Sequence, residues 1–298
     1  MAVAVAFAFL ASCGFASGAI LVRIGTQHVP APTAALLTVL SSMILVAGLA
    51  LILNLDGIKS LSPTALGWIV VLGIMGYPMA RVLVVTAISM VGASRAAPMA
   101  AIQPVIAFTL GVILLGERPN LLVTVGMPVI VAGLLLVMVP RPGANSGGPV
   151  INARRLGYAL ALAGAVTFAS RDVISRHVVT EIAAPLVSAG LALAVGGAIL
   201  TVILHRQVAR SIQTLPRNYL LICALAGVFQ GLAVASLFQA LSRAPVTVVS
   251  PIYACTPLIT LVLARVFLRR LEAIDLILVM GTLLSVLGVV LVIWGATG

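Results

Sequence analysis

Charged residues are scarce in this chain of 298 residues. Only 8% of the residues are Asp, Glu, Lys or Arg, and 62% are hydrophobic, whereas an ordinary soluble domain has about 25% charged residues. Water could not solvate such a surface, so lipid must surround most of the chain. The 17 basic residues outnumber the 6 acidic ones and mostly flank apolar runs, where they would face lipid headgroups.

Several motifs that would indicate other functions are missing from the sequence. It contains no cluster of aromatic and basic residues and no zinc-finger spacing, which argues against nucleic-acid binding. It also has no HExxH, no CxxC and no paired acids, and its three histidines are scattered. We therefore expect no metal, no cofactor and no enzymatic activity. The missing P-loop argues against a primary pump. An integral membrane enzyme, and a channel, receptor or scaffold, are the alternatives to a secondary transporter.

The N-terminus lacks the basic residues of a secretory signal. Leu10-Ala11-Ser12-Cys13 resembles a lipoprotein cleavage box, but no Lys or Arg precedes it and the apolar run continues through Val22. We expect a first transmembrane helix here, with a cleaved signal as the alternative. Cys13, Cys223 and Cys255 all lie inside apolar runs, which predicts buried thiols and no disulfide framework.

Long apolar runs dominate what the sequence does contain. A membrane span needs about 20 mainly apolar residues, and ten segments qualify: roughly 3–23, 32–53, 65–88, 94–115, 121–139, 156–178, 185–204, 217–240, 246–267 and 273–294. The longest connection, 140–155, is polar, basic and rich in Gly and Pro, which indicates a flexible linker. We predict an all-α integral membrane protein with ten transmembrane helices, divided into a first half at 1–139, a linker at 140–155 and a second half at 156–298.

The two halves repeat each other at an offset of 153 residues. FASGAILVR at 15–23 matches FASRDVISR at 168–176. Four proline pairs share this offset: Pro32/Pro185, Pro63/Pro216, Pro98/Pro251 and Pro104/Pro257. Because each half has an odd number of spans, the second half enters the membrane from the opposite side. We therefore expect two inverted five-helix repeats, a frequent design of secondary transporters whose substrate site lies at the midplane between the repeats.

Motifs in both halves carry a resemblance to a known family. The first half has Gly92-Ala93-Ser94-Arg95-Ala96-Ala97-Pro98, Gln103-Pro104, Leu114-Leu115-Gly116-Glu117-Arg118 and Gly126 to Gly133; the second has Ala244-Pro245, Pro251, Pro257, Glu272 and Gly281 to Gly288. With the topology, this pattern resembles the EamA-type members of the drug/metabolite transporter superfamily over essentially the whole chain. The second half departs from the pattern, since no Gly precedes Glu272.

The resemblance implies a function and a place for the site. It implies efflux or exchange of small metabolites, often amino acids, across a cell membrane. It also implies a central cavity lined by the first, third, fourth, sixth, eighth and ninth spans. The family is diverse in its substrates, so the resemblance names no single one.

Three ionisable residues lie well inside spans: Arg81, Arg171 and Asp172. A charge inside the bilayer is costly, so such residues usually face an aqueous cavity or a partner. We predict that they receive a charged or zwitterionic substrate, with Arg81 or Arg171 holding a carboxylate and Asp172 an amine or a coupling proton. Snorkelling to the interface and a structural Arg81–Asp172 ion pair are the alternatives. Adjacent residues point about 100° apart on a helix, so Arg171 and Asp172 are not expected to aim at one spot.

Uncharged polar side chains extend the predicted substrate-binding site. The candidates are Ser17, Tyr77, Gln103, Gln230 and Tyr253. Hydrogen bonding between helices is the alternative role, for Gln230 above all. No catalytic residue and no metal ligand is predicted.

Prolines and one short turn complete the set of candidate residues. A proline frees the carbonyl four residues earlier, so we predict kink or gate points, with static kinks as the alternative. These are Pro98, Pro104, Pro251 and Pro257. Glu117-Arg118 falls in a turn between spans, where we expect a local ion pair or a helix cap rather than a catalytic role.

The expected location is a cell membrane, crossed many times. The face that holds the linker and the loops at 205–217 and 265–270 collects most of the basic residues, and the positive-inside rule makes it cytoplasmic. The expected partners are a small-molecule substrate and the lipid bilayer, with no nucleic acid. Ten spans can enclose a site in one chain, so we expect a monomer.

Overall fold

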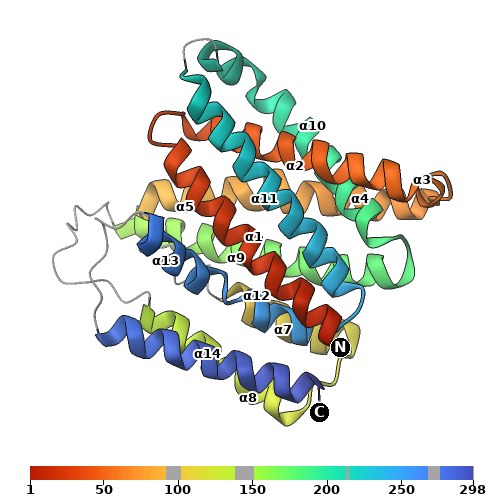
Figure 1. Cartoon of the computed structure of the whole chain (residues 1–298), viewed down its shortest axis with the longest axis vertical. Helices are drawn as coiled ribbons and strands as arrows, with labels where there is room; N and C mark the ends of the chain where they lie inside the picture. Colours follow the sequence, from red (N-terminus) through yellow and green to blue (C-terminus); the bar gives the residue numbers. More distant parts are fainter. Residues whose placement is uncertain (92–101, 138–150, 213–214, 268–275, 298) are drawn as a thin grey trace.

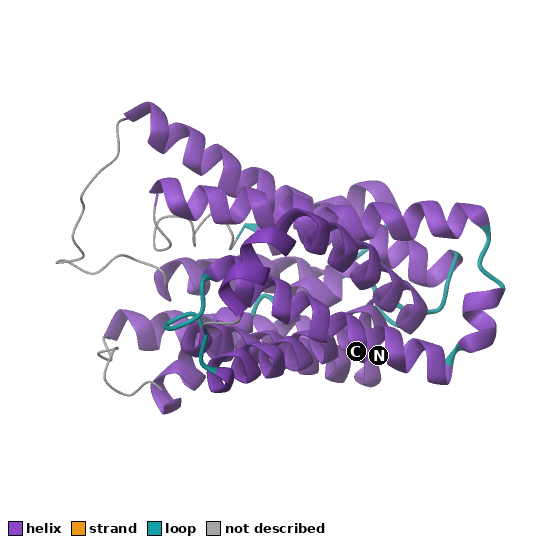
Figure 2. Ribbon diagram, turned by 90° about the horizontal axis from the view of Figure 1, so that it is seen from above, coloured by secondary structure: helices purple, strands orange, loops and turns teal. Residues whose placement is uncertain are grey.

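The computed structural model of the chain describes residues 1–91, 102–137, 151–212, 215–267 and 276–297. Every regular element in these residues is a helix (Figure 2). Six of the described helical stretches are long and apolar enough to cross a membrane, judged by length and composition, and shorter apolar helices accompany them. The predicted all-α membrane fold is therefore confirmed.

Figure 1 shows the arrangement of the helices, and each predicted span overlaps at least one of them. The first half contains α1 (Ala2–Gly25), α2 (Ala31–Leu53), α3 (Leu55–Lys59), α4 (Pro63–Ile74), the π-helical turn η1 (Met75–Met79), α5 (Ala80–Val91), α7 (Gln103–Leu115) and α8 (Leu121–Val137). The second half contains α9 (Ile151–Glu181), α10 (Pro185–Ile212), α11 (Arg217–Leu241), α12 (Val246–Tyr253), α13 (Thr256–Phe267) and α14 (Leu276–Thr297).

Two of the predicted spans are interrupted, the third without a predicted kink residue and the ninth between two of them, Pro251 and Pro257. The third is α4, η1 and α5 in direct succession, and Pro78 lies inside η1. Because proline lacks an N–H and its ring clashes with the preceding turn, the wider π turn accommodates it. The ninth span is divided into α12 and α13 at Ala254 and Cys255, and Pro257 is the second residue of α13.

Two helices extend beyond their predicted bounds. The helix α9 begins at Ile151, inside the stretch predicted as a linker. The rest of that stretch, residues 140–150, lies outside the described residues, and so do residues 94–101 of the predicted fourth span. The helix α10 continues to Ile212, past the predicted end at 204. Both extensions contain basic residues, Arg154 and Arg155 in α9 and Arg206 and Arg210 in α10.

Helices from the two halves pack against each other in a regular pattern. The helix α8 packs on α14, α2 on α10, and α7 on α12, so equivalent spans of the two halves meet. The first span, α1, packs on the eighth, α11, while the third, α5, packs on the sixth, α9. The first and sixth spans are equivalent in the two halves, and so are the third and eighth. The contact between α1 and α11 therefore corresponds to the contact between α9 and α5.

Spaced glycines explain the closest of these contacts, between α8 and α14. A Cβ atom at Gly133 would lie 2.6 Å from the carbonyl oxygen of Gly281, and one at Gly288 would lie 2.7 Å from the backbone nitrogen of Ile130. The Ser285 hydroxyl donates to the Ile130 carbonyl at 3.3 Å in the same contact. Small residues let membrane helices approach to backbone contact in this way.

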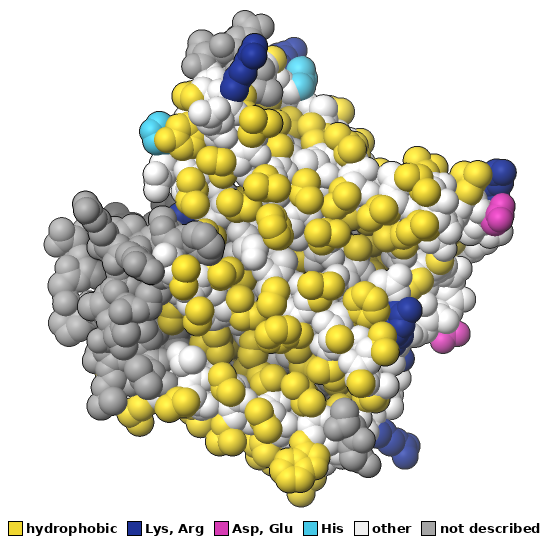
Figure 3. Space-filling model, in the orientation of Figure 1, with side chains coloured by type: hydrophobic (Ala, Val, Ile, Leu, Met, Phe, Trp, Pro, Cys, Tyr) yellow, Lys and Arg dark blue, Asp and Glu magenta, His cyan; other side chains and the backbone are white. Residues whose placement is uncertain are grey.

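The surface of the molecule fits a bilayer. Hydrophobic side chains gather over the middle of the face that α1 and α11 present, and Lys, Arg, Asp and Glu lie toward its margins (Figure 3). Cys223 and Cys255 are buried as predicted, whereas Cys13 is half-buried, and all three are free thiols. The start of α1 and the end of α14 lie on the same side of the molecule (Figure 1).

Candidate functional site

The centre of the candidate site is an ion pair between neighbours on α9, Arg171 and Asp172. The Arg171 Nε donates to Asp172 Oδ1 at 3.0 Å, and its Nη2 donates to the same oxygen. Both residues are buried, with 7% and 4% of their surfaces exposed. The expectation that the two side chains could not aim at one spot was wrong, because the long arginine side chain folds back along the helix. Asp172 pairs with Arg171 and not with Arg81.

The turn η1 makes room for the Arg171 side chain. A Cβ atom at Gly76 would lie only 2.8 Å from Arg171 Cδ, so glycine leaves the space that the arginine stem fills. The guanidinium lies over the Phe168 ring, 5.4 Å from its centroid, where a cation is attracted by the ring. Single π turns often mark functional sites in helices, and this one borders the ion pair.

The second oxygen of the Asp172 carboxylate connects the pair to three more helices. Gln103, on the first turn of α7, donates from Nε2 to Asp172 Oδ2 at 3.2 Å. The Tyr253 hydroxyl, at the end of α12, interacts with the Gln103 side chain. The Tyr253 ring meets Phe15 of α1 edge to face at a centroid distance of 5.6 Å. The cluster thus combines residues of both halves.

Arg81 and Tyr77 lie beside this cluster on the third span. Arg81 donates from Nη1 to the Ala35 carbonyl of α2 at 3.3 Å, and no carboxylate of the described residues pairs with it. Tyr77 is close enough to interact electrostatically with both Arg171 and Arg81, and its ring packs on Gly196 of α10. The described part of the site therefore carries two guanidinium groups and one carboxylate, which leaves a net positive charge.

Gln230 of α11 lies against Gly18 of α1, where a Cβ atom would be 2.6 Å from its Cγ. Within the described residues its amide has no hydrogen-bond partner. Gly18 corresponds to Arg171 at the repeat offset of 153. The two contacts are thus reciprocal: a glycine of α1 faces a polar residue of α11, and a polar residue of α9 faces Gly76 of η1.

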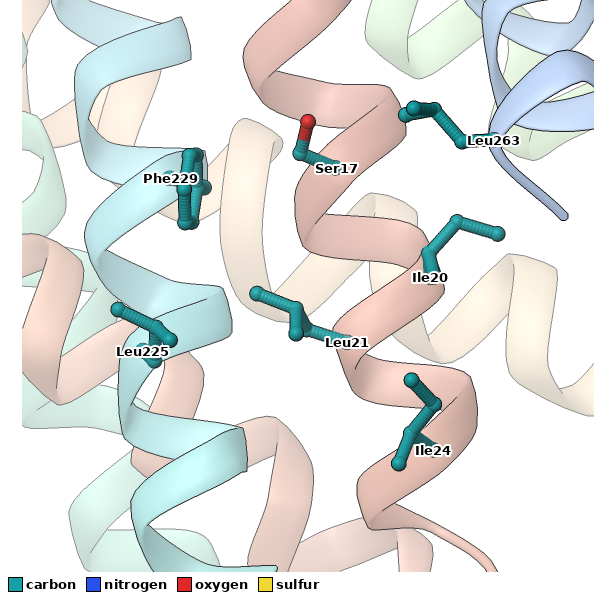
Figure 4. Close-up of a pocket in the computed structure, with 7 residues that line it drawn as sticks. All are labelled: Ser17, Ile20, Leu21, Ile24, Leu225, Phe229 and Leu263. Atoms are coloured by element: carbon teal, nitrogen blue, oxygen red, sulfur yellow. The ribbon is translucent and has the colours of Figure 1, made fainter. Parts of the chain in front are cut away.

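Ser17 is not part of the polar cluster. It lines an apolar groove of about 200 Å³ between α1, α11 and α13 (Figure 4). The other residues that line the groove are Ile20, Leu21, Ile24, Leu225, Phe229 and Leu263. This hollow contains little that could recognise a polar group, so the site is defined by the polar cluster and not by the groove.

The predicted kink residues lie at different kinds of position. Pro104 is buried in the first turn of α7, and its carbonyl accepts from the Ser250 hydroxyl at 3.4 Å. Pro251 lies inside α12, and Pro257 follows the break between α12 and α13. Pro98 lies outside the described residues. The chain is therefore interrupted next to Tyr253, at the edge of the polar cluster.

Glu117 has a partner that its sequence context does not indicate. Its two carboxylate oxygens accept from the backbone N–H groups of Val246 and Thr247 at 2.7 and 2.8 Å, at the start of α12. A helix cap was one of the two expected roles, but the capped helix belongs to the other half of the chain. In the described residues no group of three or more His, Cys, Asp or Glu could hold a metal ion.

Comparisons with known proteins agree with this architecture. The EamA-like transporter family matches residues 2–139 and 155–294. A solved crystal structure of a protein is similar over 98% of this chain and 97% of its own length, with a TM-score of 0.76 and 22% sequence identity. That likeness shows the fold alone. A comparison with curated proteins gave no match. Because the family matches nearly the whole chain in two segments, the chain belongs to the EamA-like transporter family, and it is a multi-pass membrane transporter of the drug/metabolite transporter superfamily.

Proposed function

We propose that this chain is a secondary transporter that exports or exchanges small polar metabolites, such as amino acids, across the cell membrane by alternating access. The observation that carries the proposal is the cluster of the buried pair Arg171 and Asp172 with the half-buried Gln103 and Tyr253, to which both halves contribute. A site between two halves can be exposed to either side when the halves change their packing. Buried charge inside membrane spans is costly and is usually retained for function.

The packing of the helices supports the proposed architecture of ten transmembrane helices in two inverted five-helix repeats. The repeats would be residues 1–139 and 156–298, joined by the linker at 140–155. Contacts between equivalent spans, and the exchange of partners between the first and eighth and the third and sixth spans, are what a two-fold relation between the halves produces. Such an axis in the membrane plane places the substrate site near the midplane.

The charges of the cluster favour a substrate with a carboxylate. Asp172 is already bonded by Arg171 and Gln103, whereas Arg81 has only the Ala35 carbonyl among the described residues. A guanidinium has five N–H donors, so most of those of Arg81 have no acceptor in the part of the chain that the structure describes and could serve a ligand. A carboxylate would bind at Arg81 and Tyr77. An amine on the same molecule would reach Asp172 by replacing the Gln103 bond.

The substrate's remaining surface would meet aromatic and amide groups. Phe15 and Tyr253 supply the aromatic side of the cluster, and the Gln230 amide is a donor and acceptor without a partner in the described residues. Transport of this kind requires no enzymatic activity of the protein and no cofactor. A single copy of the chain contains all the residues of the proposed site.

A flux assay in proteoliposomes tests the proposal. The purified protein is reconstituted, and uptake and exchange of labelled amino acids, organic acids and organic cations are measured against protein-free vesicles. Saturable flux with competition between substrates is the expected result. Flux that rises linearly with concentration would indicate a channel, and no flux for any compound would refute the proposal.

A further inference from the structure

Glu117 connects the two halves of the chain away from the ion pair. Its carboxylate binds the backbone N–H groups of Val246 and Thr247, which are the first two residues of α12 and have no partner within their own helix. An anion at a helix N-terminus is further stabilised by the helix dipole. The contact joins the turn between α7 and α8 to the helix that begins 129 residues later.

Two glycines aim the Glu117 carboxylate at α12. Gly116 ends α7 in the left-handed conformation, with φ of 66°, which a residue with a side chain rarely adopts. The Glu117 N–H then bonds to the Gly111 carbonyl at 3.2 Å, so the turn is closed on the end of α7. Gly111 also leaves room for the carboxylate, since a Cβ atom there would lie 3.0 Å from Oε2. The Gly-Glu motif is thus built for this contact.

The short helix α12 links the Glu117 contact to the ion-pair cluster. Glu117 holds its first residue, and Tyr253 in the cluster is its last. A helix of eight residues is about 12 Å long and moves as one body. Beyond Tyr253 the span is broken at Ala254 and Cys255. If the Glu117 end of α12 moves, Tyr253 moves with it and the break absorbs the change.

A second bond reinforces the same face of the molecule. Arg176 of α9 donates from Nη1 to the Leu241 carbonyl, at the end of α11 and just before α12. Glu117 is close enough to Arg176 to interact electrostatically. Arg176 lies four residues after Asp172 on α9, so the same helix carries both this contact and the ion pair. We call the face where α1 begins, α7 ends and α12 begins the termini face (Figure 1).

We propose that Glu117 is a latch: its bonds to α12 hold the cluster closed toward the termini face, and they must break for α12 to swing and expose the substrate to that side. The inference rests on the proposed alternating-access function. In this proposal Glu117 is a positioning residue: it does not contact the substrate, and it controls whether the substrate site opens toward the termini face.

Thiol labelling tests the latch without any substrate. Cys255 is 7% exposed and lies at the break between α12 and α13, so it reports on movement there. With Cys13→Ala and Cys223→Ala as the background, a membrane-impermeant thiol reagent is applied to proteoliposomes from each side in turn. Loss of charge-assisted hydrogen bonds is worth about tenfold or more in an equilibrium. We therefore expect Glu117→Ala to raise Cys255 labelling about tenfold, from the termini face only.

Two further variants separate a latch from a general loss of structure. Glu117→Gln keeps the size of the side chain and one acceptor oxygen, so we expect an intermediate rate with a nearly unchanged melting temperature. Asp56→Asn removes an acid from exposed α3 and should leave the rate unchanged. Equal labelling from both sides, or no change in folded Glu117→Ala and Glu117→Gln, would overturn the latch. The labelling experiment uses no substrate, so its outcome does not depend on the flux assay. If flux were absent while the labelling changed as expected, the transport proposal would be refuted and the movement of α12 would still be shown.

Discussion

Gly76 lies directly against Arg171, and a Cβ atom at position 76 would be 2.8 Å from the arginine Cδ. We expect Gly76→Ala to push the arginine stem away and to disturb its pairing with Asp172. Overpacking of this kind costs about 1–3 kcal/mol of stability, and the displaced charge should raise the KM of flux about tenfold. Gly67→Ala in α4 is the matched control, because nothing lies within 4 Å of its Cβ position. Equal KM values in the two variants would contradict the prediction.

Removing one charge of the buried pair should cost more than removing both. Asp172→Asn leaves the Arg171 guanidinium buried without its carboxylate, and breaking a buried pair costs about 3–5 kcal/mol in soluble proteins. We expect a clear fall in the melting temperature in detergent. The double variant Arg171→Gln with Asp172→Asn should recover most of that stability while flux stays low. If the double variant unfolds at the same temperature as Asp172→Asn, the pair does not behave as a coupled unit.

Hydropathy and internal repetition predict the helices well, but they predict few of the contacts at the site. A membrane span must satisfy its own backbone hydrogen bonds, so length and apolarity are enough to locate it. The ion pair between Arg171 and Asp172 depends on how a flexible side chain folds back, which the helical angle between neighbours does not fix. The partner of Glu117 depends on tertiary packing across 129 residues, and its only sequence signal is the Gly-Glu motif.

The contact between α8 and α14 should support stability and not substrate recognition. A Cβ atom at Gly133 would lie 2.6 Å from the Gly281 carbonyl, which is backbone and cannot move aside. We therefore expect Gly133→Val to separate the two helices and to lower the melting temperature in detergent by several degrees. The KM of the remaining folded protein should stay unchanged, since the ion-pair cluster lies on other helices. Gly48→Val, in α2 with nothing within 4 Å of its Cβ position, provides the matched control.

Arg81 should determine whether the transporter prefers substrates with a carboxylate. Its guanidinium has no carboxylate partner among the described residues, so a bound anion would gain a charge-assisted hydrogen bond there. We expect Arg81→Gln to raise the KM for a carboxylate substrate about 10- to 100-fold. The KM for the methyl ester of the same compound should change little, because the ester offers no charge to lose. Arg243→Gln, at an exposed arginine bonded to Gln239, controls for the loss of one positive charge elsewhere. If Arg81→Gln raises both KM values equally, the residue supports the shape of the site and does not read the carboxylate.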